Sequence, residues 1–296
     1  MAEPIPITDY KDLRKLRTRK QDRDPARSNL RTIHALDTET YEGNVFLIAD
    51  SDGKYLDEIT PDSVIKFLFH KKYQNTWNFF YNLSYDAEVI LKLLGTELNR
   101  YKRTRNLSFE FGNYNLDYIP NRKLAIRKGH HSTVFFDIAQ FYHASLVDAY
   151  QNNIKSLPAT YLEMKNKRSE FSLRFYNRNK TLIRNYCIQD CILTKELATK
   201  WVELFNNAFG FHPARWISSG YLAEKVLINN EIDFPRFDSI PYEIQDLAYR
   251  SYFGGRFEIL KRGFIGDAYL YDINSAYPYA LTHIPNLSKG RWIRQR

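Results

Sequence analysis

Cysteine and histidine are scarce in this sequence. It contains only two cysteines, Cys187 and Cys191, and its seven histidines are scattered along the chain. This scarcity argues against a disulfide framework and against a metal site built from cysteine and histidine. The two thiols stand four residues apart, so a helix would place them on one face. We therefore expect two small packing residues with free thiols in a reducing compartment.

Long apolar runs are also missing. The longest apolar stretches, such as residues 133–136, have the length of a strand and are too short to cross a bilayer. No apolar segment follows the charges at the N-terminus, as a secretory signal would require. Internal repeats and low-complexity segments are absent too. These absences predict a soluble, cytoplasmic protein with no membrane partner.

Positive charge is abundant by comparison. The 296 residues include 43 Lys and Arg against 34 Asp and Glu, which gives a formal net charge of +9. A basic surface attracts polyanions, of which nucleic acid is the commonest inside a cell, although the same charge also serves solubility. Residues 1–30 combine many cations with few apolar residues, and we expect them to form a basic, solvated tail.

The hydrophobic pattern predicts early strands followed by helices, which is typical of an α/β fold. Strands are expected at residues 31–40, 44–50, 76–81 and 268–273, with a further β region at 107–138 that turns at Gly112-Asn113 and Lys128-Gly129. Helices are expected at residues 61–70, 84–94 and 181–209. Residues 210–213 end the long helix and mark the expected domain boundary.

Acidic residues occupy faces that should be apolar. Alternation in the first strand places Asp37 and Glu39 on one side. Asp86 falls on the apolar stripe of helix 84–94, and Tyr186 and Asp190 fall on the stripe of helix 181–209. Taken singly, each acid is more simply a surface carboxylate.

Four such acids aimed at one interior would repel one another. At 4 Å a like pair costs about 1 kcal/mol in water and about 4 kcal/mol at an effective dielectric constant of 20. Protons or cations must therefore neutralise the cluster. Ligands that are all oxygen suit Mg²⁺ or Mn²⁺, and two such ions can hold an attacking water and a leaving oxygen across a phosphodiester.

In order and placement these acids resemble the 3'–5' exonuclease domain of family B DNA polymerases. Three motifs carry the resemblance: Asp37-Thr38-Glu39-Thr40, Asn82-Leu83-Ser84-Tyr85-Asp86 and Tyr186-Cys187-Ile188-Gln189-Asp190. The resemblance implies a ribonuclease H-like domain that proofreads DNA with two Mg²⁺ or Mn²⁺ ions. The implied ligands of these ions are Asp37, Glu39, Asp86 and Asp190.

The resemblance also implies roles for residues around the acids. Tyr186 would orient the attacking water, and Lys165, with Lys167 as a competitor, would contact the scissile phosphate. The residues expected to hold the single-stranded 3' end are Thr40, Asn82 and Tyr85.

Two later motifs resemble polymerase elements. Tyr252-Phe253-Gly254-Gly255-Arg256 is similar to the Tyr-x-Gly-Gly element that links exonuclease and polymerase sites. Tyr252, Gly254, Gly255 and Arg256 are therefore expected to contact DNA, the glycines by letting the backbone approach a strand closely. Asp272-Ile273-Asn274-Ser275-Ala276-Tyr277-Pro278 looks like polymerase motif A. It implies a metal ligand at Asp272 and nucleotide contacts at Ser275 and Tyr277.

The layout and wording of the motifs resemble the protein-primed branch of the family, which serves phages, archaeal viruses and linear plasmids. The implied domains are a tail at 1–30, an exonuclease at 31–210 and the start of a polymerase palm at 211–296. Implied partners are a single-stranded DNA 3' end, primer-template DNA and a terminal priming protein inside the host cell. Later polymerase motifs are not found, so this chain alone is not expected to polymerise. The alternatives are a free-standing 3'–5' exonuclease on DNA or RNA and a non-catalytic single-strand-binding module.

Overall fold

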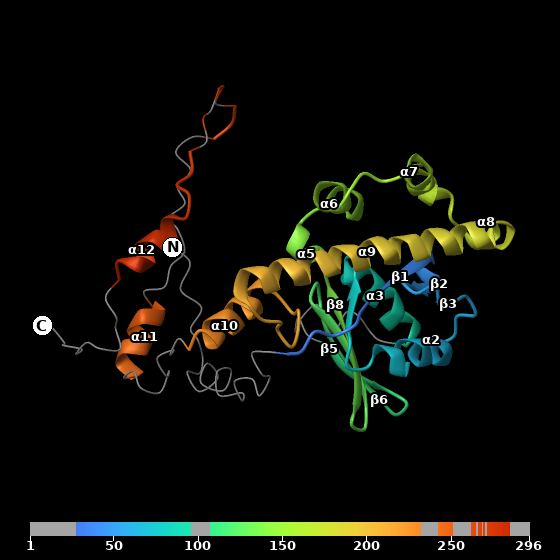
Figure 1. The fold of residues 1–296 in the computed structure, drawn as a ribbon, viewed down its shortest axis with the longest axis horizontal. Helices are drawn as coiled ribbons and strands as arrows, with labels where there is room; N and C mark the ends of the chain where they lie inside the picture. The colour runs from blue at the N-terminus through green and yellow to red at the C-terminus, as the bar shows by residue number, and fades with distance from the viewer. Residues whose placement is uncertain are drawn as a thin grey trace, which may run out of the picture. The chain divides into compact units, whose positions relative to one another are not determined.

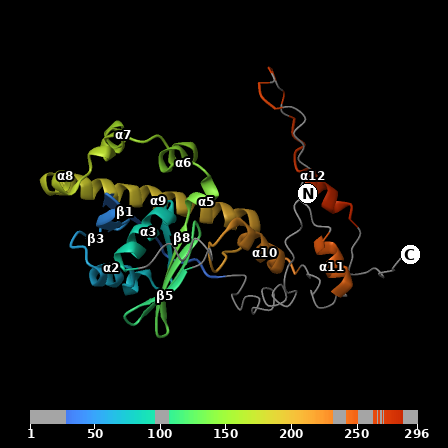
Figure 2. The ribbon, with the colours of Figure 1, turned by 180° about the vertical axis from the view of Figure 1, so that it is seen from behind.

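The chain divides into two compact units, Met1–Glu231 and Ile232–Arg296, which are described separately. The structure is a computed structural model, and it describes residues 28–95, 107–231, 242–250 and 262–284, the last range with gaps at 265, 268 and 270. Figures 1 and 2 show the ribbon from opposite sides. Among the described residues, no helix combines the length and apolarity needed to cross a membrane.

An eight-stranded mixed sheet forms the centre of the first unit, with strand order β3-β2-β1-β4-β8-β7-β6-β5. Strands β1, β4 and β8 are parallel, whereas β2 runs antiparallel between β1 and β3. Strands β5, β6 and β7 extend the sheet beyond β8 as an antiparallel meander. The strands are β1 (Ile33–Tyr41), β2 (Asn44–Asp50), β3 (Tyr55–Leu56), β4 (Trp77–Phe80), β5 (Leu107–Phe111), β6 (Tyr114–Ile119), β7 (Lys123–Lys128) and β8 (His131–Asp137).

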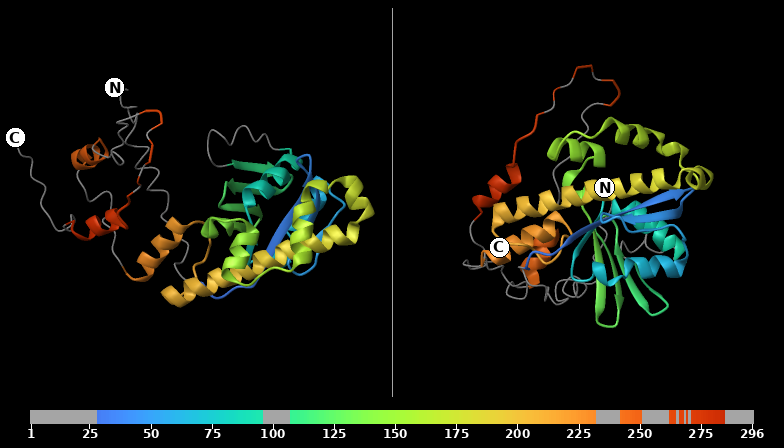
Figure 3. Two further views of the ribbon diagram at one scale, coloured as in Figure 1. Left: turned by 90° about the horizontal axis from the view of Figure 1, so that it is seen from above. Right: turned by 45° about the vertical axis from the view of Figure 1, so that its right-hand side comes forward.

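Helices cover both faces of this sheet. One core cluster packs α2 and α3 against it, and another packs α6, α7 and α9 against the opposite face. The left view of Figure 3 shows strands β1 and β2 lying between α3 and α9. The helices are α2 (Pro61–Leu68), α3 (Leu83–Leu93), α5 (Ala139–Tyr142), α6 (Leu146–Asn153), α7 (Ala159–Asn166), α8 (Leu173–Arg178), α9 (Lys180–Phe209) and α10 (Ser219–Asn229), with 3₁₀ turns η1 (Lys71–Tyr73) and η3 (Lys167–Glu170).

Local sequence signals explain several of the element ends. Pro61 opens α2, and Thr60 and Ser63 form a reciprocal capping box there. Helix α9 ends at Phe209 and is capped by Gly210, whose φ of 73° is a left-handed conformation that glycine adopts at no steric cost. Both ends are therefore set by residues next to the helices as well as by packing.

Most of the predicted elements of the first unit are confirmed. Strand 44–50 matches β2, helix 181–209 begins one residue earlier as α9, and the β region 107–138 contains β5 to β8 with both predicted turns. The turn at residues 120–122 was not predicted. Cys187 and Cys191 are buried free thiols on α9, as expected.

The second unit contains α11 (Tyr242–Arg250) and α12 (Ala276–Thr282) among its described residues. The prediction of a strand at 268–273 is wrong for residues 271–273, which are irregular. The first unit continues through α10, beyond the helix end at Gly210, because Trp216 is fully buried against Trp77. The division into exonuclease and palm stays a prediction.

Helix α9 should contribute strongly to stability through its buried face. Leu197 is fully buried on α9, whereas Leu204 on the same helix is 44% exposed. We expect Leu197→Ala to lower the free energy of unfolding by about 2–5 kcal/mol, and Leu204→Ala by less than about 0.5 kcal/mol. Urea denaturation followed by circular dichroism measures both. Equal losses in the two variants would contradict this packing of α9.

Candidate active site

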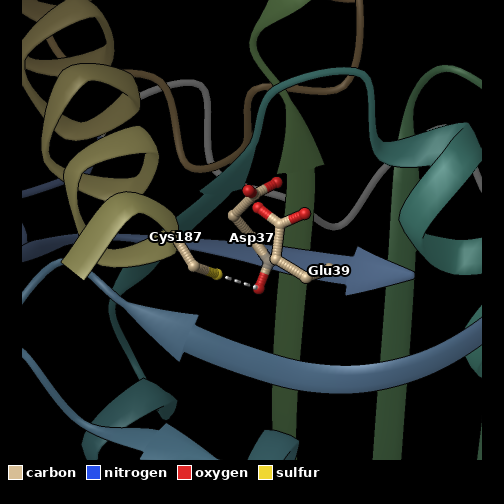
Figure 4. A group of neighbouring side chains, drawn as sticks. All are labelled: Asp37, Glu39 and Cys187. Carbon is tan, nitrogen blue, oxygen red and sulfur yellow. Dashed lines mark hydrogen bonds between the residues drawn. The ribbon is translucent and has the colours of Figure 1, made fainter. Parts of the chain in front are cut away.

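Four acidic side chains from three elements line one pocket of about 1050 Å³. Asp37 and Glu39 lie on β1, Asp86 lies in the first turn of α3, and Asp190 lies midway along α9. Figure 4 shows the carboxylates of Asp37 and Glu39 side by side. The structure thus brings together the four residues that the sequence analysis selected as acids on apolar faces.

Direct hydrogen bonds tie Asp86 to strand β1. Its Oδ1 accepts from the Thr38 backbone N–H at 3.1 Å and from the Thr38 hydroxyl at 2.6 Å. Asp137 fixes the turn before α3, because its Oδ1 accepts from the backbone N–H groups of Asn82 and Ala139 at 3.1 and 3.0 Å. Asp137 therefore supports the pocket without lining it, and burial raises its pKa to about 6.

Asp190 is held from the opposite side by helix α7. The Tyr161 hydroxyl donates to its Oδ1 at 2.6 Å, and Lys165 Nζ lies 3.2 Å from its Oδ2. Tyr161 stacks on Tyr186, with ring centroids 5.7 Å apart and an interplanar angle of 18°. The Tyr186 hydroxyl is buried and makes no hydrogen bond of normal geometry with the described residues. Tyr186 is not among the residues that line the pocket.

Burial and mutual repulsion disfavour the charged forms of these acids. Burial, with Asp190 nearby, raises the pKa of Asp37 to about 7. Burial and the charge of Asp37 also raise the pKa of Glu39 and of Asp86 well above their ordinary values. Arg168, with Nε 3.9 Å from Glu39 Oε2, opposes this effect. The four acids that line the pocket therefore outnumber its two cationic side chains, Lys165 and Arg168.

Two carboxylate oxygens in the pocket wall are buried without a hydrogen-bond partner among the described residues. They are Asp37 Oδ2 and Glu39 Oε1. Buried oxygens of this kind need a donor or a cation, and carboxylate oxygens are the ligands that hard divalent ions prefer. The donor set therefore fits Mg²⁺ or Mn²⁺.

Among the described residues, the group close enough to share an ion with Asp37 and Glu39 is the thiol of Cys187. Its Sγ approaches the backbone carbonyl oxygen of Asp37 at 3.7 Å, as the dashed line in Figure 4 shows. Burial raises the pKa of this thiol well above its ordinary value, and the protonated thiol is a poor metal ligand. Cys187 therefore acts as packing behind the carboxylates.

The residues predicted to hold a strand end lie around the same pocket. Thr40, Asn82 and Tyr85 line it, and the hydroxyls of Thr40 and Tyr85 are hydrogen-bonded to each other. Tyr85 is 46% exposed, so its ring is open to a ligand and is not a core aromatic. Lys165 also lines the pocket, whereas Lys167 is exposed outside it. Their contacts with DNA stay predictions.

Several residues at the site belong to none of the sequence motifs. Tyr161, Arg168 and Phe171 reach the site from the segment that precedes α9, and residues 143–146 form part of the wall between α5 and α6. Tyr161 and Lys165 are four residues apart on α7, and this spacing was the one sequence signal that they share a face. The sequence did not predict that this face of α7 would contact Asp190.

The predicted polymerase residues belong to the second unit. Asp272 and Tyr277 are exposed there, and Ser275 adopts a left-handed conformation at the start of α12. Tyr252, Gly254, Gly255 and Arg256 lie outside the described residues. Their predicted roles are therefore neither supported nor opposed by side-chain geometry.

Comparisons with known proteins agree on one family. A family model described as "DNA polymerase type B, organellar and viral" matches residues 69–290, which is more than half of the chain. The chain is also similar to a DNA polymerase of Acidianus bottle-shaped virus (isolate Italy/Pozzuoli), with 27% identity over 165 residues. That match covers 51% of this chain and 24% of the viral protein, so the chain spans about a quarter of its relative.

Without divalent ions, Asp37 should make stability depend on pH. Its pKa is about 7 in the folded chain against an ordinary 3.8, so the folded state binds this proton more tightly than the unfolded state does. The resulting stability is complete below about pH 4 and is lost as the pH rises through about 7. In EDTA, wild type should lose more Tm between about pH 5 and pH 8 than Asp37→Asn, measured by thermal melts. Parallel pH profiles for the two proteins would contradict the raised pKa.

Proposed function

The chain belongs to the organellar and viral type B DNA polymerases, and from this premise we propose that its first unit is a 3'–5' exonuclease that proofreads DNA. One observation carries the proposal. Asp37, Glu39, Asp86 and Asp190 converge on one pocket in which buried carboxylate oxygens lack partners. Protons or cations must neutralise such a cluster, and phosphodiester hydrolysis is one of the reactions that paired divalent ions serve.

The topology supports a ribonuclease H-like assignment for this unit. The strands β3-β2-β1-β4-β8 form a mixed sheet in which only β2 runs opposite to the others. The acids lie on the central strand β1 and on helices that cover its two faces. The β5–β7 meander would be an addition at the β8 edge of this core.

Two Mg²⁺ or Mn²⁺ ions would be held by the four acids and would supply positive charge that polarises the phosphodiester and lowers the pKa of water. The protein's own groups then have distinct tasks. Tyr186 presents a buried hydroxyl beside Asp190 that can orient the attacking water. Lys165, whose Nζ lies 3.2 Å from Asp190 Oδ2, would contact the scissile phosphate.

The strand end would be held beside the acids. The exposed ring of Tyr85 offers a stacking surface, and its hydroxyl is fixed by Thr40. Asn82 lines the same pocket and can bond a sugar or base edge. Single-stranded DNA would thus enter with its 3' end toward Asp37 and Glu39.

We extend the proposal to the second unit from its motif alone. Asp272 would bind a metal of the polymerase site, and Ser275 and Tyr277 would contact the incoming nucleotide. The residue pattern of the motifs favours the protein-primed branch, with primer-template DNA and a terminal protein as partners inside the host cell. Polymerisation by the whole protein is part of this proposal, and this chain matches 24% of the viral relative.

Removal of Asp37 tests the nuclease. With Mg²⁺ and a 5'-labelled single-stranded oligonucleotide, wild type should shorten the strand from its 3' end. Asp37→Ala should slow this reaction about hundredfold or more, because the ions lose a shared ligand. Glu110→Gln is the matched control, since Glu110 is an exposed acid on β5 outside the pocket, and it should leave the rate unchanged. Equal rates in Asp37→Ala and wild type would refute the proposal.

Tyr85 should act through its ring. Stacking of a base on an aromatic side chain contributes roughly 1–3 kcal/mol, so Tyr85→Ala should raise KM for single-stranded DNA roughly 5- to 150-fold. Tyr85→Phe keeps the ring, loses only the bond to Thr40, and should change KM less than about threefold. Steady-state kinetics on an oligothymidylate decides between them. A Phe variant as impaired as the Ala variant would assign the effect to the hydroxyl.

A further inference from the structure

Two cationic side chains enter the acidic pocket from the segment formed by α7 and η3. Lys165 Nζ lies 3.2 Å from Asp190 Oδ2, and Arg168 Nε lies 3.9 Å from Glu39 Oε2. Both acids are almost fully buried, whereas the side chains of Lys165 and Arg168 are 25% and 40% exposed. Each cation therefore reaches a buried acid from the open side of the pocket.

Arg168 is loosely held at this position. Its approach to Glu39 is longer than a hydrogen bond. A guanidinium carries five N–H donors in a planar fork, and this geometry suits the oxygens of a phosphate. Its contact with Glu39 therefore leaves most of its donors for another partner.

The charge of Arg168 is nevertheless important to the cluster. It lowers the pKa of Asp37, Glu39 and Asp86 and so partly offsets their burial. Glu39 and Asp37 in turn raise the pKa of Arg168, although burial opposes its charge. A divalent ion bound to Glu39 would remove this attraction and repel the guanidinium.

We propose that Arg168 is an exchangeable cation: it neutralises Glu39 when no ion is bound and contacts a phosphate of the bound strand once ions take its place. This inference rests on the proposed nuclease, and it adds a residue outside the motifs to the machinery that binds DNA. Because the two positions exclude each other, ion binding and strand binding become coupled, and coupling of this kind is reciprocal.

Two binding measurements on the full chain test the exchange without catalysis. The first is calorimetric titration with Ca²⁺ in the absence of DNA. Arg168→Gln removes a competing cation, so its ion affinity should rise about threefold or more. The second is fluorescence anisotropy with a labelled oligothymidylate, in EDTA and in Ca²⁺. Arg168→Gln should change affinity less than about twofold in EDTA but weaken it about tenfold in Ca²⁺, the loss expected for one charge-assisted hydrogen bond.

Lys167→Gln is the matched control, because it removes the same charge from an exposed neighbour outside the pocket. It should shift DNA affinity equally in EDTA and Ca²⁺ and leave ion affinity unchanged. Thermal melts confirm that the variants fold, and Arg168→Lys, which keeps the competing charge, should bind ions as wild type does.

The exchange is overturned if Arg168→Gln binds Ca²⁺ more weakly than or as tightly as wild type, since Arg168 would then merely support Glu39. It is also overturned if the DNA affinity of Arg168→Gln falls equally with and without Ca²⁺. If the wild type binds ions and DNA but does not shorten a strand, the proposed nuclease activity is refuted, whereas the exchange of Arg168 is not.

Discussion

Burial of four carboxylates in one pocket is the constraint on which this structure depends. Like charges at short range repel, and the repulsion grows as water is removed from around them. The four acids Asp37, Glu39, Asp86 and Asp190 stay together because apolar contacts elsewhere in the fold hold the strand and helices that carry them. Strand β1 is buried on both faces of the sheet, and α3 and α9 cover those faces with large apolar clusters.

The surrounding polar contacts make the arrangement more specific. Thr38 fixes Asp86 to β1, and Tyr161 fixes Asp190 to α7, so acids from distant segments are bound to their neighbours. Lys165 and Arg168 then supply part of the missing positive charge from a segment that is more exposed than the acids. The result is a set of buried carboxylate oxygens faced by two more exposed cations, and this arrangement agrees with the proposed site for metal ions and phosphates.

Much of this could be predicted from the sequence, because the signals are local. Alternation along β1 put Asp37 and Glu39 on one side, and helical spacing put Asp86 and Asp190 on buried faces. Arg168 and Tyr161 could not be found in this way, because their importance comes from the direction in which α7 and η3 pack on α9. The turn at residues 120–122 was missed because it relies on Asn121 in a left-handed conformation, without the glycine that marked the other two turns.

Anomalous scattering from crystals grown with Mn²⁺ tests the central claim most directly. Data collected at the manganese edge locate the ions independently of any activity. The account predicts two peaks within bonding distance of the carboxylates of Asp37, Glu39, Asp86 and Asp190. A pocket without a peak, or manganese bound only at other acids, would contradict it.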